Sequence, residues 1–561
     1  MTRRPSIPRR DFIATASAAL AAIGCGGRVG ATSGNRWELV VRGGTIVDGS
    51  GGAPIEGDVA IAKGRIAAIG RSLAGTGDEE VDARGLVVAP GFIDIHSHAD
   101  GTIFEDPRAE SIIRQGITTV VVGQDGSSRA PAPEHVDTPR ERMEHAMRVG
   151  GRYDSIGDFL AGIDRLPPAV NFATMVGLGT IRGAVVGDAD RPATREEILR
   201  MHALVGAALN QGACGASSGL EYVPGAFASQ EELAALCQPL AEARLPYATH
   251  MRNEDDRLLE SIDESIAVAR TAGCPLQIAH LKTQGPRNWP KIGAALERVD
   301  KARADGLDVA FDRYPYVAYQ TGLTNLFPPW SRDGGTERFL ERLRDSSTSS
   351  RIRNEAIAKV ELIGGWNNVQ ITSVRNAADR AAEGQRLGAW AQAQGLDPYE
   401  ATVGLLERSA GDVGMVGFAM SEENIERFLA HPLGMVCSDG GAFATEGPAR
   451  RGHPHPRSLG SFPRVLGRYV RERRALTLQD AVRKMSAFPA SRVRLTGRGM
   501  LRQGYAADVV VFDPSTVTDT ATFAEPFRYP EGIRVVIVNG VTALRDGARA
   551  ERRAGRALRP F

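Results

Sequence analysis

The middle of this 561-residue chain alternates short apolar segments with longer stretches of helical periodicity, and this alternation restricts the fold more than any other feature. Eight apolar segments predict strands: residues 91–95, 117–123, 171–177, 212–219, 246–250, 275–280, 308–314 and 433–438. Helical stretches separate most of them, for example residues 195–211, 230–243 and 254–272. Because parallel strands need a crossover connection, usually a helix, this order predicts an α/β fold, a (β/α)8 barrel of the TIM type.

The regions before and after this alternating middle are rich in short β segments instead. Apolar runs separated by glycine-rich breaks fill the region before residue 90, and a similar style returns after residue 507, with Asn539-Gly540 as a hairpin turn. We therefore expect residues 36–90 and 495–561 to pair into a small β-sandwich domain beside a barrel of residues 91–494. A long gap between the seventh and eighth strands predicts a lid insertion at about residues 317–371.

The first 35 residues have the pattern of an export signal and a tether. Arg9-Arg10-Asp11-Phe12-Ile13 precedes a short apolar run and resembles a twin-arginine (Tat) signal, which predicts use of the Tat export machinery and a periplasmic or exported location. Cys25 follows Ala22-Ile23-Gly24, a weak lipoprotein box, so lipid anchoring at Cys25 stays open. A net charge of +1 gives no support for a nucleic-acid partner, and a small-molecule substrate is expected.

Four histidines and an aspartate fall at the ends of predicted strands. His96 and His98 close the first strand, and residues two apart on a strand point to the same side. His250, His280 and Asp439 end the fifth, sixth and eighth strands. A single such histidine is more often packed in a core, but five polar groups at the catalytic end of a barrel predict a metal site, and imidazole with carboxylate suits Zn²⁺.

Together these segments resemble the D-aminoacylase (N-acyl-D-amino-acid deacylase) family of the metal-dependent amidohydrolase superfamily. The resemblance extends from about residue 37 to about residue 544. The matching motifs are Gly91-Phe92-Ile93-Asp94-Ile95-His96-Ser97-His98, Gly116-Ile117-Thr118-Thr119-Val120, Thr249-His250-Met251-Arg252-Asn253-Glu254, His280-Leu281-Lys282, Asp312-Arg313-Tyr314-Pro315-Tyr316, Ser438-Asp439-Gly440, His455-Pro456-Arg457 and Gly460-Ser461-Phe462-Pro463-Arg464-Val465-Leu466-Gly467.

One position departs from that family. Its members carry a cysteine metal ligand after the second strand, whereas this chain reads Gly123-Gln124-Asp125-Gly126. A carbamylated lysine from the fourth strand is excluded as a bridging ligand, because no lysine lies between Lys63 and Lys282. One or two zinc ions are expected, and a bridging ligand, if there is one, must be a carboxylate such as Asp125 or Glu221. Both could instead be loop carboxylates hydrogen-bonded to the backbone, and the choice stays open.

The ligand types predict hydrolysis. Zn²⁺ lowers the pKa of bound water from about 16 towards about 7, which supplies hydroxide at neutral pH, and it polarises an amide carbonyl. Asp439 would take the water proton and pass it to the departing amine. The alternative for Asp439 is to orient a ligand histidine by accepting a hydrogen bond from it.

Substrate-binding residues are expected around the same end of the barrel. Lys282 and Arg252 each lie two residues past a ligand histidine, Tyr314 and Tyr316 follow the seventh strand, and Arg457 follows the eighth. The resemblance implies that a lysine and a tyrosine in these positions hold the α-carboxylate of the substrate. A solvent-facing role stays open for Arg252 and Arg457.

The sequence therefore predicts a zinc-dependent enzyme that removes the acyl group from N-acyl-D-amino acids, with the D-configuration implied by the resemblance alone. Alternatives are a dipeptidase that releases D-amino acids, a cyclic-amide hydrolase, or a periplasmic metal-binding lipoprotein without turnover. Retention of Asp439 argues against the last, because a protein that only binds has no need of a proton shuttle.

Overall fold

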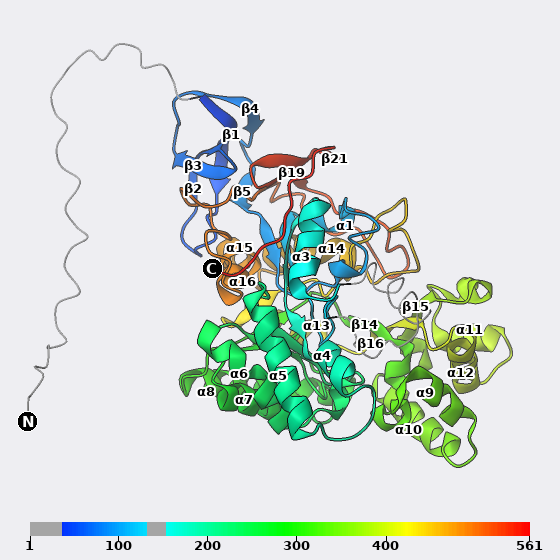
Figure 1. The fold of residues 1–561 in the computed structure, drawn as a ribbon. Coiled ribbons are helices and arrows are strands. Elements are labelled where there is room, and N and C mark those ends of the chain that lie inside the picture. Colours follow the sequence, from blue (N-terminus) through cyan, green and yellow to red (C-terminus); the bar gives the residue numbers. More distant parts are fainter. Residues whose placement is uncertain (1–35, 132–152) are drawn as a thin grey trace, which may run out of the picture.

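The structure is a computed structural model that describes residues 36–131 and 153–561 (Figure 1). The predicted export signal, Cys25 and the tether lie outside the described residues. Within the described ranges, no helix is both long and apolar enough to pass through a bilayer.

Parallel strands form the centre of an α/β fold, which agrees with the predicted class. One parallel sheet contains β6 (Phe92–Asp94), β7 (Ile117–Val122) and β8 (Asn171–Thr174). A second contains, in order, β17 (Gly434–Val436), β13 (Val309–Arg313), β12 (Leu276–Ile278), β11 (Tyr247–His250), β10 (Ala216–Gly219) and β9 (Val176–Gly177). Met175 alone separates β8 from β9, and a parallel bridge between Ser97 and Gly440 joins the ends of β6 and β17.

Helices connect these strands and cover them. They are α3 (Ile156–Arg165), α4 (Leu178–Val185), α5 (Arg195–Asn210), α6 (Gln230–Ala243), α7 (Leu258–Ala272), α8 (Ile292–Ala304) and α13 (Glu422–Ala430), followed by α14 (Arg457–Arg464), α15 (Leu478–Met485) and α16 (Ala487–Arg492). Local sequence fixes where they begin. At α5, the Thr194 hydroxyl accepts from the Glu197 amide at 3.2 Å while the Glu197 carboxylate accepts from the Thr194 amide at 2.7 Å, a reciprocal capping box.

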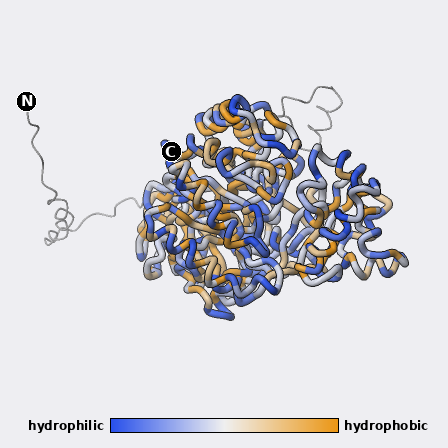
Figure 2. The backbone as a smooth tube through the Cα atoms, turned by 90° about the horizontal axis from the view of Figure 1, so that it is seen from below, coloured by the Kyte–Doolittle hydropathy of each residue, from blue (hydrophilic) through white to orange (hydrophobic). Residues whose placement is uncertain are grey.

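The parallel strands are buried on both faces, which explains why they read as continuous apolar runs. Hydrophobic and hydrophilic segments alternate along the chain (Figure 2). One hydrophobic core lies between the helices and the parallel strands. A second core lies on the opposite face of these strands and extends into the inserted elements.

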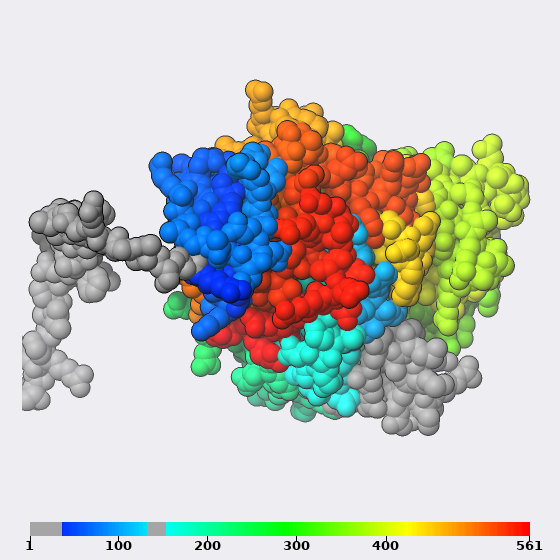
Figure 3. Space-filling model, turned by 90° about the horizontal axis from the view of Figure 1, so that it is seen from above, coloured from blue at the N-terminus to red at the C-terminus, as the bar shows by residue number. Residues whose placement is uncertain are grey.

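The two ends of the chain share one nine-stranded sheet. Its N-terminal strands are β1 (Arg36–Ile46), β2 (Ile55–Ala62), β3 (Arg65–Gly70), β4 (Thr76–Asp82) and β5 (Val87–Pro90), and its C-terminal strands are β18 (Val509–Phe512), β19 (Ile533–Val538), β20 (Val541–Arg545) and β21 (Ala548–Arg549). The halves join where β5 pairs antiparallel with β18, for example Val88 with Val511. Figure 3 shows the N-terminal strands in blue beside the C-terminal segment in red. The boundaries of a separate sandwich domain stay a prediction.

A group of inserted elements follows β13. It contains β14 (Ala318–Gly322), η4 (Leu323–Leu326), η5 (Pro329–Arg332), α9 (Gly335–Arg344), α10 (Ser349–Leu362), β15 (Val369–Val374), α11 (Leu387–Ala393), α12 (Pro398–Arg408) and β16 (Val413–Phe418). These elements lie at one end of the molecule (Figure 1). They continue past residue 371, the expected end of the insertion, because β16 returns to pair between β14 and β15 in an antiparallel sheet.

Candidate metal centre and substrate pocket

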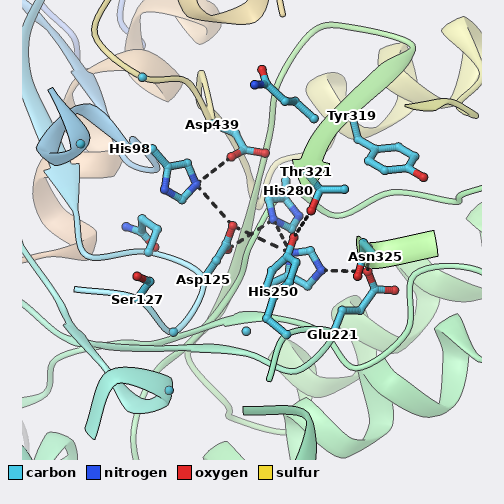
Figure 4. Close-up of a pocket in the computed structure, with 18 of the residues that line it drawn as sticks. His98, Asp125, Ser127, Glu221, His250, His280, Tyr319, Thr321, Asn325 and Asp439 are labelled. Carbon is cyan, nitrogen blue, oxygen red and sulfur yellow. Dashed lines mark hydrogen bonds and ion pairs between the residues drawn. The ribbon is translucent and has the colours of Figure 1, made fainter. Parts of the chain in front are cut away.

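A cavity of about 650 Å³ lies where the parallel strands end (Figure 4). The polar residues predicted at strand ends meet here because parallel strands place their carboxyl ends at the same edge of a sheet. Tyr319, Thr321 and Asn325, from β14 and η4, line another side of the cavity. The cavity is thus formed jointly by the parallel strands and the inserted elements.

The first group of ligand-type side chains contains His96, His98, Asp125 and Asp439. Their nearest oxygen and nitrogen atoms all lie within 4.8 Å of one another. His98 Nε2 is 3.1 Å from Asp439 Oδ1 and 3.4 Å from Asp125 Oδ2. His96 Nε2 is 3.4 Å from Asp125 Oδ1 and 3.6 Å from Asp439 Oδ1. These residues follow β6, β7 and β17, so three strand ends supply one group.

The second group contains His250, His280 and again Asp125. Asp125 Oδ1 is 3.4 Å from His280 Nε2, and Asp125 Oδ2 is 3.9 Å from His250 Nδ1. Asp125 therefore lies between the histidines of both groups (Figure 4), and each of its carboxylate oxygens is near one histidine of each group. This is the position that a bridging ligand would occupy.

Glu221 lies on the far side of His250. Its carboxylate is 3.4 Å from His250 Nε2 and accepts a hydrogen bond from Asn325 Nδ2 at 3.1 Å. It forms a third ligand-type group with His250 and Glu254, but neither His96 nor His98 belongs to that group. Of the two carboxylates left open by the sequence, only Asp125 is shared by the two histidine pairs.

The residues present fit a metal ion. Both ring nitrogens of His96 and Oδ1 of Asp125 are buried without a hydrogen-bond partner among the described residues. Buried polar atoms are normally paired, so the unpaired His96 Nε2 and Asp125 Oδ1, which lie 3.4 Å apart, indicate a missing partner such as a cation. The donors are imidazole nitrogen and carboxylate oxygen, a set that suits Zn²⁺.

The pKa values of the ligand histidines also support a cation at this site. Burial lowers the pKa of His98, but the carboxylates of Asp125 and Asp439 outweigh it and raise the pKa to about 9. Burial likewise lowers the pKa of His96, yet Asp125 and other carboxylates hold it well above its usual value. An excess of negative charge in a buried site favours positive charge among its ligands, whether a proton or a metal ion.

Three of these residues have left-handed backbone conformations. The φ angles are 52° at Asp125, 33° at His280 and 50° at Asp439. Such angles are uncommon for residues with a side chain, and they are concentrated at functional sites, where surrounding structure enforces them. All three follow directly on strand ends, so the strained backbone aims each side chain across the cavity.

The sequence reasoning assigned no role to Glu254 or Asp312, which support the ligand histidines. Glu254 Oε1 is 3.1 Å from His280 Nδ1, and its other oxygen accepts from Lys282 Nζ at 2.5 Å. Asp312 Oδ1 accepts from the His280 amide at 2.8 Å and lies 3.6 Å from His96 Nδ1. Only their positions in the sequence could have indicated these roles. Asp312 is a carboxylate at the end of a predicted strand, and Glu254 lies four residues after His250.

Three of the predicted substrate-binding residues line the cavity. Lys282 and Arg457 are both buried, and Arg457 Nη1 donates to Asp439 Oδ2 at 2.6 Å. The Tyr314 ring lies under the Arg457 guanidinium at 4.8 Å, and its hydroxyl has no partner among the described residues. Two cations and a free hydroxyl thus converge beside the ligand groups.

The structure places the other two away from the cavity lining. The Arg252 guanidinium binds Glu264 on α7 and the carbonyl oxygens of Ala226 and Ala228, so its donors point towards protein groups. The Tyr316 hydroxyl lies 3.3 Å from Asp519 Oδ2. For both, the loop after the strand directs the side chain away from the cavity, which residue spacing alone does not reveal.

Comparisons with known proteins agree with this geometry. The family model described as "Amidohydrolase family" matches residues 79–340 and 447–543. The chain is 37% identical to N-acyl-D-glutamate deacylase and 36% identical to D-aminoacylase, both from Alcaligenes xylosoxydans xylosoxydans, over 93% of this chain and 96% and 97% of those proteins. It also resembles the crystal structure of N-acyl-D-glutamate deacylase from Bordetella bronchiseptica, complexed with zinc and a phosphonate inhibitor, with a TM-score of 0.79, 35% identity, and coverage of 94% of this chain and 100% of that one.

Proposed function

Because this chain belongs to the amidohydrolase family, we propose that it hydrolyses the amide bond of N-acyl-D-amino acids and releases a carboxylate and a free D-amino acid. The observation that carries the proposal is the meeting of two ligand groups at Asp125 beside Lys282, Tyr314 and Arg457. The chain is 35–37% identical to three deacylases of N-acyl-D-amino acids, which supports the substrate class.

We also infer that the parallel strands close into a (β/α)8 barrel. Two observations support closure: Met175 alone interrupts the chain between β8 and β9, and Ser97 bridges Gly440 between the ends of β6 and β17. The eight strands then follow one another in chain order around the barrel, with the ligand groups at its carboxyl end.

The ligand groups hold one or two zinc ions. His96, His98, Asp439 and Asp125 would hold one ion, and His250, His280 and Asp125 a second, with Asp125 as the bridge. When bound, zinc supplies an activated water and polarises the amide carbonyl. Glu254, 3.1 Å from His280 Nδ1, and Asp312, which accepts from the His280 amide, would hold His280 in place for an ion.

Asp439 is placed to move a proton. Burial raises its pKa, but the positive charges of Arg457 and His96 outweigh burial and hold the pKa well below the usual range, so the carboxylate is ionised at neutral pH. It accepts a proton from the attacking water and delivers it to the amine nitrogen as the C–N bond breaks. An amine must be protonated to leave, so this transfer is part of the bond-breaking step.

Lys282, Tyr314 and Arg457 bind the α-carboxylate of the substrate. All three line the cavity: Arg457 donates to Asp439, Lys282 donates to Glu254, and the Tyr314 hydroxyl has no partner among the described residues. A carboxylate held here fixes the scissile amide next to the ligand groups, because only a short chain of atoms separates the two.

The test combines zinc content per chain with amine release from paired N-acetyl-D- and N-acetyl-L-amino acids. We expect one to two zinc ions and D-selective release. Asp439→Asn should keep its zinc at the second group and lower kcat by about 10²–10⁴-fold, the usual contribution of a proton-transfer group. Zinc without cleavage of any N-acetyl-D-amino acid would favour the dipeptidase or the cyclic-amide hydrolase, and unchanged kcat in Asp439→Asn would overturn the role of Asp439.

We further propose that the protein is exported through the Tat machinery to the periplasm, or beyond it, with Cys25 as a candidate lipid anchor. The support is the twin-arginine motif and the residues before Cys25. Fractionation of cells that express the full chain and its Arg9→Lys/Arg10→Lys variant tests export, since the variant should stay in the cytoplasm. Cys25→Ala tests anchoring, because an anchored protein should then be released from the membrane fraction.

A further inference from the structure

A second cavity, of about 530 Å³, borders the substrate pocket and is lined by four arginines. They come from two segments: Arg375 and Arg380 follow β15, and Arg450 and Arg451 lie in the loop between β17 and α14. We call this cavity the arginine recess. Its two walls are far apart in the sequence, so the fold brings the four cations together.

The positive charge of the recess is poorly compensated. Glu383 is the one acidic residue in its lining, and the Glu383 carboxylate accepts from the Val374 amide at 3.0 Å. Arg451 pairs with Glu105 at 3.2 Å, but both side chains are more than one-third exposed, so the pair is weak. Arg375 and Arg380 have no side-chain partner among the described residues. All four arginines are exposed, so salt screens their mutual repulsion in part, and the net positive charge of the lining still favours an anion.

The recess adjoins the substrate pocket. Gln320, Phe443 and Arg451 line both cavities. The Gln320 carbonyl oxygen accepts from Arg457 Nη2 at 3.4 Å, so the recess begins next to the residue that holds the substrate carboxylate. The Thr372 hydroxyl, buried and without a partner among the described residues, belongs to the same lining. The two cavities are therefore neighbours, with Gln320, Phe443 and Arg451 in the wall that they share.

We propose that the arginine recess binds a second anionic group of the substrate, a carboxylate separated by several bonds from the amide that is cleaved. This inference rests on the proposed function. The planar guanidinium offers paired N–H donors that match a carboxylate, and such charge-assisted hydrogen bonds are stronger than neutral ones. The second carboxylate can belong to the side chain of an acidic D-amino acid or to the end of a diacid acyl group, and both present the same chemistry to the recess.

The test compares substrates that differ only in the second charge. N-acetyl-D-glutamate is paired with N-acetyl-D-glutamine, and N-succinyl-D-leucine with N-butyryl-D-leucine. The double variant Arg375→Gln/Arg380→Gln removes the two unpaired cations. Arg71→Gln/Arg195→Gln is the matched control, since it makes the same charge change at two exposed arginines that do not line the recess.

We expect the Arg375/Arg380 variant to lose about tenfold or more in kcat/KM, mostly through KM, for the charged member of at least one pair. Both neutral members should change by less than about twofold, as should all four substrates in the control variant. The pair that responds identifies whether the carboxylate is on the side chain or on the acyl group. Arg375→Glu should enlarge the loss, because it puts a negative charge in the recess.

Equal effects on charged and neutral substrates, or no effect in either variant, would overturn the proposal. Hydrolysis of N-acetyl-D-leucine by the unmodified enzyme tests the proposed function separately, because that substrate has no second charge. If N-acetyl-D-leucine is cleaved while the variants show no charge-dependent loss, the deacylase assignment holds and the recess has no part in substrate binding. If no D-amide is cleaved, both proposals fail together.

Discussion

Asp125 is the residue at which the two ligand groups meet, and its carboxylate oxygens face four histidines from three strand ends. A carboxylate offers two oxygens for two ions, so Asp125 could serve alone as the proposed bridge. The sequence restricted the choice to two carboxylates by excluding lysine, but it could not choose between them. The choice depends on which loop turns towards the histidines, and the left-handed backbone at Asp125 makes that turn.

Asp125→Asn should lower the zinc content by about one ion per chain. An amide is a neutral and weaker ligand, so the carboxylate that neutralises two dications is lost. Elemental analysis after dialysis measures the effect, and Glu221→Gln is the matched control, since Glu221 is not shared by the histidine pairs. Full zinc occupancy in Asp125→Asn, with a loss in Glu221→Gln, would assign the bridge to Glu221 instead.

Arg457→Met and Arg252→Met should change different properties of the protein: the first should change KM and the second the unfolding midpoint. Arg457 lines the pocket and is expected to bind the substrate carboxylate, so its loss should raise KM by about 10- to 100-fold. Arg252 binds Glu264 and two carbonyl oxygens, so its loss should lower the unfolding midpoint and leave KM unchanged. Steady-state kinetics and thermal unfolding of both variants check this. A higher KM in Arg252→Met alone would contradict the placement of both side chains.

At the scale of elements, the inserted group is tied to the pocket by one lysine of α10. Lys359 Nζ lies 2.7 Å from Asp255 Oδ2 and 3.8 Å from Glu221 Oε1. Both carboxylates are buried, so Lys359 neutralises charge that would otherwise be stranded. The insertion therefore supports the wall of the pocket as well as covering it.

Lys359→Met should lower the free energy of unfolding by about 3–5 kcal/mol, because breaking a buried ion pair leaves an uncompensated charge. Urea denaturation measures the change. Lys301→Met is the matched control, since Lys301 forms an exposed pair with Asp305 and should leave the midpoint essentially unchanged. Equal midpoints for the two variants would show that Lys359 does not stabilise the insertion.

A helix or strand can be predicted from the sequence when the interactions that form it lie within the segment itself. The parallel strands are predictable because burial on both faces makes them continuous apolar runs, and α5 and α6 are predictable from their caps. The end of the insertion is not, because β16 pairs with strands about 40 and 90 residues earlier. Arg252 and Tyr316 show the same limit, since spacing from a strand gives no direction to a side chain on the following loop.

At the scale of the whole molecule, Asn539 joins the nine-stranded sheet to the parallel strands. Asn539 Nδ2 donates to Asn171 Oδ1 in β8 and to the Ala554 carbonyl oxygen, each at 2.7 Å. Its Oδ1 accepts from Arg498 at 2.8 Å. One side chain therefore connects three segments that are distant in the sequence.

Asn539→Gly should lower the free energy of unfolding by about 1–3 kcal/mol, since it deletes three hydrogen bonds and leaves buried partners unpaired. Glycine also accepts the backbone φ of 50° at this position, so the loss reports on the side chain. In the unmodified protein and in Asn539→Gly alike, the circular-dichroism signal and the enzyme activity should be lost at the same urea concentration. Separate transitions would mean that the sheet and the catalytic part unfold independently.

The pairing of β5 with β18 has a consequence for the synthesis of the protein on the ribosome. Roughly 400 residues separate the two strands, so at about 5–20 residues per second β5 waits on the order of half a minute or longer for its partner to leave the ribosome. During that wait its edge can pair with other chains, and a chaperone would have to protect it. Only a completely synthesised chain can finish its first sheet, which suits a route of secretion that accepts proteins after they have folded.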